Sequence, residues 1–559
     1  MQWHTACPDW AERLVAGQSI IPPPLYPDQA AQALSIFKHL RVVDLPGKPT
    51  FGECSDQWVF DFVAAIFGGY DAQTGQQLIR EVLLLISKKN TKSTVAAGIM
   101  MTAVILCWRE DEEHLILAPT KEVADNSFKP AAGMVRADPE LSALFHVQDH
   151  LRTITHRVSR ASLKVVAADT DTVTGKKAGR VLVDELWLLG KKSNASAMLM
   201  EALGGQVSRP EGWVIFLTTQ SDEPPAGVFR EKLIYHRSVR DGKIHDPRSL
   251  GILYEWPQAM LNSKAYLEPD NFHITNPNLG RSVSREWLED QLRRSQNTPD
   301  GSFQQFLAKH LNVEIGLALR SDNWAGAEYW EAMARPGITL ESILERSEVI
   351  TVGIDGGGLD DLLGLAVVGR ERGTRRWLGW CRAWAHPSVL QRRKEIAPRL
   401  QDFAANGDLV LVQQIGDDVA EVAAIVFLID QAGLLHEAGL DPAGIGAILE
   451  ALVGMGIAPE KVVGVSQGWR MGGAIKTTER KLAEGALQHA DQPLMDWCCS
   501  NAKVEPRANS ILITKQASGS AKIDPLMALF NAVSLMAANP AAMGSMDDYL
   551  NNGFFGLIG

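Results

Sequence analysis

The chain has few cysteines for its 559 residues, and their spacing does not suit a metal site. The six are Cys7, Cys54, Cys107, Cys381, Cys498 and Cys499. No pair has the spacing of metal ligands, and the adjacent pair is geometrically poor for an ordinary disulfide. We therefore expect reduced thiols rather than a framework of disulfides or bound zinc.

Long hydrophobic runs are lacking too. The longest apolar stretch, 96–108, is shorter than the roughly 20 residues that a membrane-spanning helix needs. Residues 1–9 do not show the basic-then-apolar order of a secretory signal. These absences predict a cytoplasmic protein with no membrane partner.

An excess of positive charge is also missing, because 55 Lys and Arg against 66 Asp and Glu give a net charge of −11. An acidic protein can still carry a locally basic channel, so the charge neither supports nor excludes a DNA partner. No internal repeat or low-complexity tract is visible. The hydrophobic content of 46% and the length predict two to four domains with sizeable cores.

A lysine-serine loop follows the first clear strand. The apolar run 82–86 leads into this loop at 87–94. A buried strand that ends in such a turn can direct backbone N–H groups, an ammonium and a hydroxyl at a triphosphate and its Mg²⁺. The usual pattern has glycine where Ile86 and Thr91 stand, and a Lys-Ser pair also occurs in the solvated first turn of ordinary helices. Taken alone, the loop is weak support for nucleotide binding.

An acidic pair and a threonine pair follow two later strands. The run 181–183 ends in Asp184-Glu185, and the run 213–217 ends in Thr218-Thr219. One carboxylate can hold a metal through water while the other orients an attacking water. Because ligands of open α/β sheets sit at the carboxyl ends of the strands, these tips should converge with the lysine-serine loop.

The segments between these motifs predict an α/β fold. Candidate strands at 114–118 and 162–168 alternate with helices, one of which begins near Lys121. Two more helices are expected at 284–295 and 302–310. Strands that alternate with helices predict a mostly parallel sheet in the first half of the chain.

The second half carries three separated carboxylates. Asp355 ends a strand from 349 at a glycine-rich turn and a hairpin partner follows at 362–368, while Asp441 follows an apolar stretch and Asp524 precedes an apolar helix. A two-metal nuclease needs acids from distant positions around ions about 4 Å apart.

Each of these acids has another interpretation. Asp441 and Asp524 each precede a proline and could start ordinary helices. The turn after Asp355 could belong to a phosphate loop of the sugar-kinase and actin type, and Asp417-Asp418 competes with Asp441, whose preceding stretch is a poor strand.

The order of these motifs resembles the large terminase subunit of tailed bacteriophages, from about Gln57 to Ala537. The resemblance rests on Lys-Lys-Asn-Thr-Lys-Ser-Thr at 88–94, Val-Asp-Glu-Leu-Trp at 183–187, Thr-Thr-Gln at 218–220, Asn-Pro-Asn-Leu-Gly at 276–280, Leu-Asn at 311–312 and Lys-Ile-Asp at 522–524. It implies an ATPase domain of the P-loop type followed by an RNase H-like nuclease domain.

The resemblance also implies roles for individual residues. In the ATPase, Gln57 would contact adenine, Lys92 the β- and γ-phosphates and Ser93 the Mg²⁺. The nucleotide site would also include Lys88, Lys89, Asn90, Thr91 and Thr94. Asp184 would hold the metal, Glu185 would be the catalytic base, and Thr218 and Thr219 would couple hydrolysis to movement. In the nuclease, Asp355, Asp441 and Asp524 would hold the metal ions, with Asp361 as a possible auxiliary. The implied cofactors are ATP and Mg²⁺, with Mn²⁺ possible at the nuclease site. The missing glycine at Thr91 should reduce ATP affinity or rate if that position needs a positive φ.

Our leading hypothesis is a motor that packages double-stranded DNA into a procapsid and cuts the concatemer. Its implied partners are the portal protein and the small terminase subunit, and it would form a homo-oligomeric ring on the portal in the host cytoplasm. The predicted organisation is a lead-in at 1–50, the ATPase at 51–335, a linker at 336–348, the nuclease at 349–540 and a flexible tail at 541–559. The alternatives are a helicase-like repair translocase with a fused nuclease, and a non-enzymatic prophage remnant that binds the portal.

Overall fold

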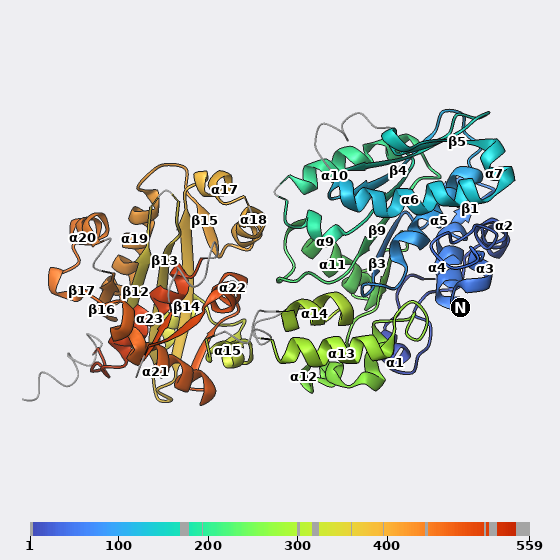
Figure 1. The fold of residues 1–559 in the computed structure, drawn as a ribbon. Helices are drawn as coiled ribbons and strands as arrows, with labels where there is room; N and C mark the ends of the chain where they lie inside the picture. Colours follow the sequence, from blue (N-terminus) through green and yellow to red (C-terminus); the bar gives the residue numbers. More distant parts are fainter. Residues whose placement is uncertain are drawn as a thin grey trace, which may run out of the picture. The chain divides into compact units, whose positions relative to one another are not determined.

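The computed structural model describes residues 4–167, 178–192, 194–298, 302–315, 324–358, 360–394, 396–441, 445–507, 510–513 and 522–543. Most of the predicted tail therefore lies outside the described residues. The chain forms two compact units, 1–315 and 316–559, which are treated separately below (Figure 1). None of the described helices is long and apolar enough to cross a membrane.

The boundary between the units falls earlier than the linker predicted at 336–348. The reason is that the segment before this linker packs into the second unit. Trp324 and Trp330 are almost fully buried there, and the Trp330 ring stacks on His489 with the centroids 3.8 Å apart. The turn residues at 334–337, which suggested a domain boundary, include the short strand β11 (Ala334–Arg335) of the second unit's sheet.

The first unit is built around one sheet. Among the described residues its strands are β3 (Glu81–Leu85), β4 (Glu113–Ala118), β5 (Phe145–Gln148), β6 (Thr153–His156), β7 (Ser162–Ala167), β8 (Arg180–Val183), β9 (Trp213–Thr218) and β10 (Ser249–Leu253), and β1 (Tyr70–Asp71) pairs with β2 (Gln76–Gln77) in a separate hairpin. Their order is β10-β3-β9-β8-β4-β7-β6-β5, parallel from β10 to β7 and antiparallel at the β6 and β5 edge. The predicted mostly parallel sheet is thus confirmed.

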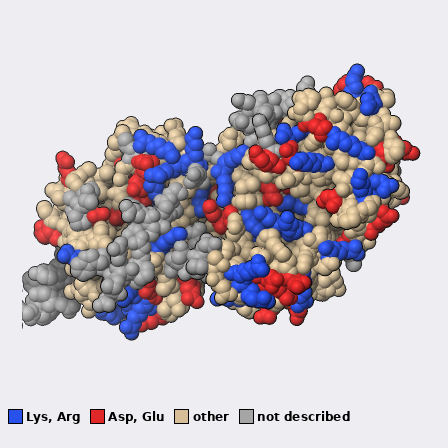
Figure 2. All heavy atoms as spheres, viewed as in Figure 1, with Lys and Arg blue, Asp and Glu red and all other residues tan. Residues whose placement is uncertain are grey.

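The first unit also contains helices. They are α1 (Trp10–Val15), α2 (Pro27–Phe37), α3 (Phe51–Cys54), α4 (Gln57–Phe67), α5 (Lys92–Ile105), α6 (Lys121–Ala137), α7 (Pro139–Leu144), α9 (Leu186–Leu189), α10 (Ala195–Leu203), α11 (Gly227–Arg240), α12 (Gln258–Asn262), α13 (Arg285–Gln296) and α14 (Ser302–Leu311). The strands of the sheet centre are buried on both faces, as their uninterrupted apolar runs require. On the visible face of this unit, acidic and basic side chains are intermixed rather than separated (Figure 2).

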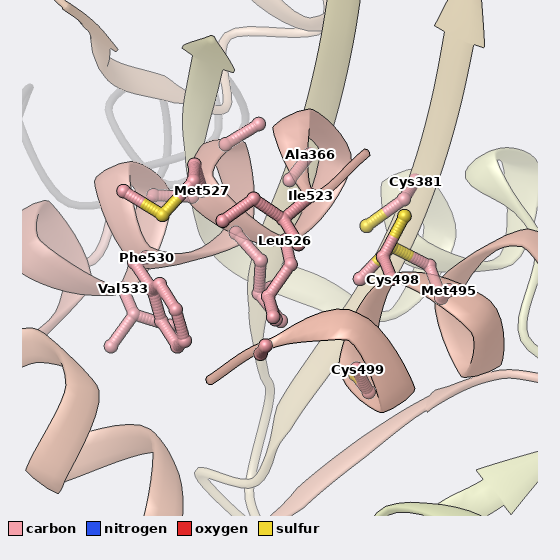
Figure 3. Packing of buried hydrophobic residues seen from close by; sticks show 14 of the residues in the cluster. Ala366, Cys381, Met495, Cys498, Cys499, Ile523, Leu526, Met527, Phe530 and Val533 are labelled. Atoms are coloured by element: carbon pink, nitrogen blue, oxygen red, sulfur yellow. The ribbon is translucent and has the colours of Figure 1, made fainter. Parts of the chain in front are cut away.

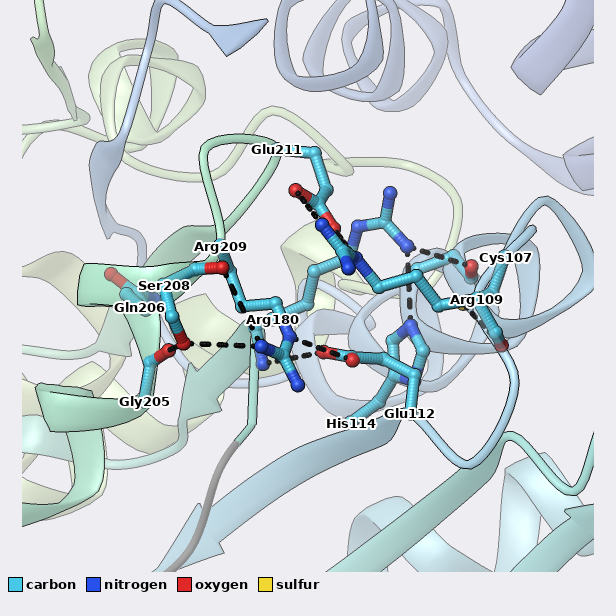
Figure 4. A network of polar contacts seen from close by, with 12 residues as sticks. Cys107, Arg109, Glu112, His114, Arg180, Gly205, Gln206, Ser208, Arg209 and Glu211 are labelled. Atoms are coloured by element: carbon cyan, nitrogen blue, oxygen red, sulfur yellow. Dashed lines mark hydrogen bonds and ion pairs between the residues drawn. The ribbon is translucent and has the colours of Figure 1, made fainter. Parts of the chain in front are cut away.

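A polar network ties together the amino ends of β4 and β8 (Figure 4). Glu112 accepts hydrogen bonds from the Gly179 N–H at 3.0 Å and the Arg209 guanidinium at 2.8 Å, and Arg180 donates to the His114 ring at 3.2 Å. Burial and the Arg180 charge lower the pKa of His114 to about 3, so this ring is neutral at pH 7. The network stabilises the edge of the sheet opposite the carboxyl ends that carry the predicted site.

The second unit has a mixed sheet. Its described strands are β11, β12 (Ser347–Gly356), β13 (Leu363–Glu371), β14 (Trp377–Ala385), β15 (Leu409–Leu411), β16 (Leu435–Leu440), β17 (Val462–Gly464) and β18 (Leu487–Ala490), and β19 (Val504–Arg507) pairs with β20 (Ser510–Ile513) separately. The order is β11-β18-β14-β13-β12-β16-β17, with β15 beside β14. Strands β12, β13 and β14 are antiparallel, which confirms the predicted hairpin, and the other pairings are parallel.

The helices of this unit include a long buried one next to the sheet. They are α15 (Ala327–Met333), α16 (Leu340–Arg346), α17 (Ser388–Arg392), α18 (Ala397–Ala405), α19 (Asp417–Gln431), α20 (Ile445–Gly454), α21 (Gly472–Ala483), α22 (Pro493–Asn501) and α23 (Asp524–Met536). Figure 3 shows apolar side chains of α23, among them Leu526 and Phe530, in the core that also holds Cys381, Cys498 and Cys499. All six cysteines are free thiols, as predicted.

The view that the stretch before Asp441 is a poor strand is wrong. Residues Leu435–Leu440 form β16, which pairs with β12 on one side and β17 on the other. Two flanking strands override the weak local preference of His436 and Glu437. Gly439 lets this strand pack closely, since a Cβ there would lie 2.7 Å from a Val465 methyl and would displace it.

Helix α23 packs directly against β12 because a glycine of that strand, Gly353, has no side chain at the contact. A Cβ on Gly353 would overlap the Ala528 carbonyl oxygen and lie 2.5 Å from the Ala532 nitrogen. Two hydrogen bonds fix the contact, from Thr351 to the Ala532 carbonyl at 2.9 Å and from the Asn531 amide to the Ile354 carbonyl at 2.8 Å. This close packing brings the first residue of α23 to the end of β12.

Gly353→Ala is therefore expected to lower the free energy of unfolding by about 2 kcal/mol or more, because backbone atoms of α23 would have to move. Denaturant unfolding of the chain measures the loss. The matched control is Gly473→Ala, a helical glycine with open space around it, which should be neutral or slightly stabilising. Equal midpoints for the two variants would contradict the close packing.

Candidate active sites

The lysine-serine loop connects β3 to α5, and α5 begins at Lys92. The φ angle of Thr91 is 57°, which is the left-handed conformation that glycine adopts without cost. A threonine held there costs about 1–3 kcal/mol. Hydrogen bonds hold it in place, because the Thr91 hydroxyl donates to the Asn90 carbonyl at 2.8 Å and accepts from the Asn278 amide at 3.0 Å.

The acidic pair at the end of β8 meets this loop. The Lys92 ammonium lies 2.8 Å from Glu185 Oε1, and the Ser93 hydroxyl donates to Asp184 Oδ2 at 3.2 Å. The Ser127 hydroxyl also donates to that oxygen, at 3.3 Å. Strand β9 lies between β3 and β8 in parallel register, so the three strand ends form one edge. Lysine, serine and both acids are thus brought together from two separate parts of the chain.

The two acids differ in their electrostatic setting. Burial raises the pKa of Asp184, and the nearby Lys92 charge offsets this only in part. Burial also acts to raise the pKa of Glu185, but the Lys92 charge and hydrogen bonds from Lys92 and Trp187 outweigh it and hold that pKa below its usual value. Of the two acids, Glu185 is therefore the one whose ionised form the surroundings favour more strongly.

This arrangement fits ATP with a divalent cation. A hydroxyl and a carboxylate within hydrogen-bond distance, Ser93 and Asp184, are oxygen donors of the type that Mg²⁺ prefers. The buried ammonium of Lys92 and the N-terminus of the helix that it begins favour phosphate groups.

The other predicted ATP-site residues lie around this edge. Gln57 is the exposed first residue of α4 and donates to Asp61 at 2.8 Å. Lys88 and Lys89 are exposed at the loop, Asn90 is fully buried and Thr94 is half-buried in the first turn of α5. Thr218 and Thr219 are fully buried at the end of β9.

The end of β9, with Thr218 and Thr219, is joined directly to the loop that carries Asp184 and Glu185. The Trp187 backbone N–H donates to the Thr218 hydroxyl at 3.2 Å, and the Trp187 indole N–H donates to Glu185 at 2.6 Å. Trp187 thus contacts both Glu185 and the end of β9.

Asn276 and Asn278 hold the loop from outside. The Asn90 amide donates to Asn276 at 2.9 Å and Asn90 Oδ1 accepts from the Asn278 backbone at 3.0 Å. Asn278 also accepts from the Trp58 indole at 2.7 Å, which ties the start of α4 to the loop. Both asparagines belong to the Asn-Pro-Asn segment that supports the family resemblance, but the sequence predicted no role for either of them.

Lys309 was also missed, because nothing in its spacing distinguishes it from other helix lysines. Its ammonium lies 2.9 Å from the Trp187 ring centroid and donates to the Gln220 carbonyl at 2.8 Å, while its own carbonyl accepts from the Lys88 N–H at 2.8 Å. One residue of α14 therefore contacts all three strand-end loops.

A pH test follows for Lys309. Burial lowers its pKa to about 7, against the pull of the Asp222 and Glu185 carboxylates. Between pH 7 and about 10 the unfolded chain holds a proton that the folded chain has lost, so folding gains stability as pH rises through this window. The unfolding midpoint of the wild type should therefore rise relative to that of Lys309→Met between pH 7 and 9.

The control for this test is Lys243→Met. The Lys243 side chain is 73% exposed and pairs with Asp241, and its charge does not contribute to the lowered pKa of Lys309. Its removal should leave the difference from wild type constant across the same pH range. A trend of the same size in both variants would contradict the interpretation.

In the second unit, Asp355 and Asp524 come together. Asp355 is 4% exposed near the end of β12, and Asp524 is fully buried at the start of α23. A Cβ on Gly356, the residue after Asp355, would lie 2.9 Å from Asp524 Oδ1. Gly356 has a φ of 87°, so only glycine serves easily at this turn.

Register favours Asp441 over Asp417 as the third acid. Leu440 pairs with Ile354, so Asp441 and Asp355 follow at the same end of two adjacent parallel strands. Asp417 lies in the first turn of α19, beyond β15, which is separated from β12 by β14 and β13. Carboxylate oxygens are ligands that hard divalent cations prefer, but in the part of the chain that the structure describes no three such side chains lie close enough together to hold a metal ion.

Asp361, the possible auxiliary ligand, forms an ion pair with a lysine. Its carboxylate lies 2.8 Å from the Lys522 ammonium, which also donates to the Asp360 carbonyl at 3.0 Å. Lys522 is buried two residues before Asp524. It therefore ties the turn after Asp355 to the start of α23.

Comparison with known proteins identifies the family. The family models for "Terminase large subunit, ATPase domain" and "Terminase large subunit, endonuclease domain" match residues 58–235 and 254–539. The large terminase subunit of Enterobacteria phage HK97 is 22% identical over 507 residues, 89% of this chain and 93% of that protein. Protein YmfN of Escherichia coli is 22% identical over 339 residues, 59% of this chain and 71% of that protein. The crystal structure of the HK97 bacteriophage large terminase covers 90% of this chain and 99% of its own, with 20% identity and a TM-score of 0.46.

The family match and the observed sheets confirm the predicted α/β fold class, with a terminase ATPase domain followed by a terminase endonuclease domain. It does not favour the helicase-like alternative. The two domains imply that the protein uses a nucleotide and divalent metal ions and binds DNA. The chain belongs to the terminase large-subunit family, and it is an ATP-hydrolysing phage DNA-packaging motor with an endonuclease.

Proposed function

We propose that the edge formed by β3, β9 and β8 hydrolyses ATP bound with Mg²⁺. Lys92 neutralises the β- and γ-phosphates, Ser93 and Asp184 hold the cation, and Glu185 orients the attacking water. The contact of Lys92 and Ser93 with these two acids supports this most directly. Bound Mg²⁺ supplies charge neutralisation for the phosphates.

The remaining loop residues keep supporting roles in this proposal. Lys88, Lys89, Asn90, Thr91 and Thr94 shape the phosphate site, and Gln57 contacts adenine, since the neighbouring Trp58 is tied to the loop through Asn278. Thr218 and Thr219 transmit hydrolysis to DNA movement through the Trp187 contact.

The second unit cuts the packaged DNA in this proposal. Asp355, Asp441 and Asp524 hold two Mg²⁺ ions, which Mn²⁺ can replace, and such ions activate water and stabilise the leaving oxygen of a phosphodiester. The proposal includes double-stranded DNA as substrate, the portal protein and small terminase subunit as partners, and a ring of copies on the portal in the host cytoplasm.

The choice between Asp441 and Asp417 has a direct test. Asp441→Asn is expected to reduce plasmid cleavage in Mg²⁺ or Mn²⁺ by about 10²-fold or more, because a metal-holding carboxylate is lost. Asp417→Asn should cut like the wild type, and EDTA should stop both. The reverse ranking would transfer the role to Asp417 and show that strand register misleads here.

A further inference from the structure

A pocket of about 480 Å³ lies between α13, α14 and the lysine-serine loop, within the first unit. This volume is in the range of small-molecule sites. Four of its lining residues are basic or potentially so, namely Lys88, Arg294, Lys309 and His310. Among the described residues, no acidic side chain lines it. Because the His310 ring is neutral at pH 7 and burial lowers the pKa of Lys309 to about 7, Lys88 and Arg294 carry most of the charge that attracts anions to the pocket.

Aromatic rings form one wall of this pocket. The His310 ring lies edge-on to Trp287 with the centroids 4.9 Å apart and stacks on Phe306 at 5.5 Å. Trp287 is 41% exposed, which is unusual for so large an apolar side chain. Exposed aromatic rings beside cations are the combination that stacks a base while holding its phosphate.

The wall also has unused hydrogen-bonding capacity. In the described part of the chain, the buried Nδ1 of His310 has no hydrogen-bond partner. Burial and the Lys88 and Lys89 charges lower the pKa of His310 to about 4, so the ring is neutral at pH 7. A buried ring nitrogen without a partner is costly, and a polar ligand in the pocket would satisfy it.

The pocket adjoins the ATP site and shares Lys88 of the lysine-serine loop with it. Gln57, Lys92, Ser93 and Asp184 do not line it. Lys309 does, and the same residue bonds to the Gln220 carbonyl and lies over the Trp187 ring. A ligand that draws on the Lys309 ammonium would compete with these contacts.

We propose that this pocket is a second phosphate-binding site, which takes one nucleotide unit with its phosphate on Lys88 and Arg294 and its base against Trp287. Occupancy changes ATP turnover through Lys309, a step that rests on the proposed ATP site. The nucleotide unit comes either from free nucleotide or from a DNA strand, and the two sources share the same chemistry.

Arg294→Gln tests the pocket, with Arg293→Gln as matched control. Arg293 lies on the same helix, is 71% exposed, bonds to Asp290 at 3.1 Å and does not line the pocket. One arm measures ADP binding to Lys92→Ala protein, in which the first site is weakened. The other measures the affinity of a fluorescent oligonucleotide at several salt concentrations.

Arg294→Gln is expected to weaken binding about fivefold or more in one arm, and that arm identifies the source. For DNA, the slope of log affinity against log salt should fall by about 1. Trp287→Leu, which keeps every charge, should weaken the same arm. Equal behaviour of the Arg294 and Arg293 variants in both arms would overturn the proposal.

The link to hydrolysis has its own readout. The ligand that binds in the pocket should change wild-type ATP turnover, and Arg294→Gln should remove this response while turnover without that ligand stays unchanged. A wild type that does not hydrolyse ATP would refute the proposed function, whereas the binding arms would still report on the pocket. A wild type that hydrolyses ATP with equal binding by both arginine variants would refute the pocket alone.

Discussion

Lys92→Ala is expected to lower ATP turnover by about 10²- to 10³-fold and to leave plasmid cleavage unchanged. The ammonium is buried and 2.8 Å from Glu185, at the position where the phosphate charge would develop. Loss of one preorganised charge or donor at such a place costs this much in related chemistry. Steady-state ATP hydrolysis and plasmid nicking on the same preparation measure both effects.

Two controls make this result interpretable. Lys243→Ala removes an ammonium that is 73% exposed and should keep full ATP turnover. Lys92→Ala also leaves Glu185 without its counter-charge, so the double variant Lys92→Ala/Glu185→Gln should recover folding stability but not activity. Unimpaired ATP turnover by Lys92→Ala would remove Lys92 from the site.

The strands that build the ATP site were predictable because their signal is local. Val82–Ile86 and Val181–Val183 are apolar without interruption and end abruptly in polar residues, as central parallel strands do. The structure places them at β3 and β8 with shifts of one residue. The meeting of their polar ends follows from the rule that ligands of open α/β sheets bind at the carboxyl ends of the strands.

Other features depend on partners that are distant in sequence. Strand β16 is formed by pairing with β12 and β17, so its own residues carry little strand signal. Lys309 becomes important only because α14 is positioned to reach Trp187 and Gln220. The positive φ of Thr91 is held by Asn278, which lies almost two hundred positions later in the chain. Spacing within one segment contains none of this information.

Asp355→Asn and Asp524→Asn are each expected to reduce metal-supported plasmid cleavage by about 10³-fold while ATP turnover persists. Both substitutions keep the shape of the side chain, which matters because Asp524 packs against Gly356 in a fully buried place. An amide donates where a metal ligand must only accept, so the loss is chemical rather than structural. Thermal unfolding midpoints within a few degrees of the wild-type value would show that the loss of cleavage does not come from unfolding.

The effects of the two substitutions on plasmid cleavage should not add. Because both carboxylates would hold the same ions, the double variant should cut no more slowly than the weaker single variant. Asp418→Asn, which changes a half-buried acid in the first turn of α19, should cut like the wild type. If both single variants still cleave plasmid, the acids that meet between β12 and α23 serve packing, and the nuclease site lies elsewhere in the second unit.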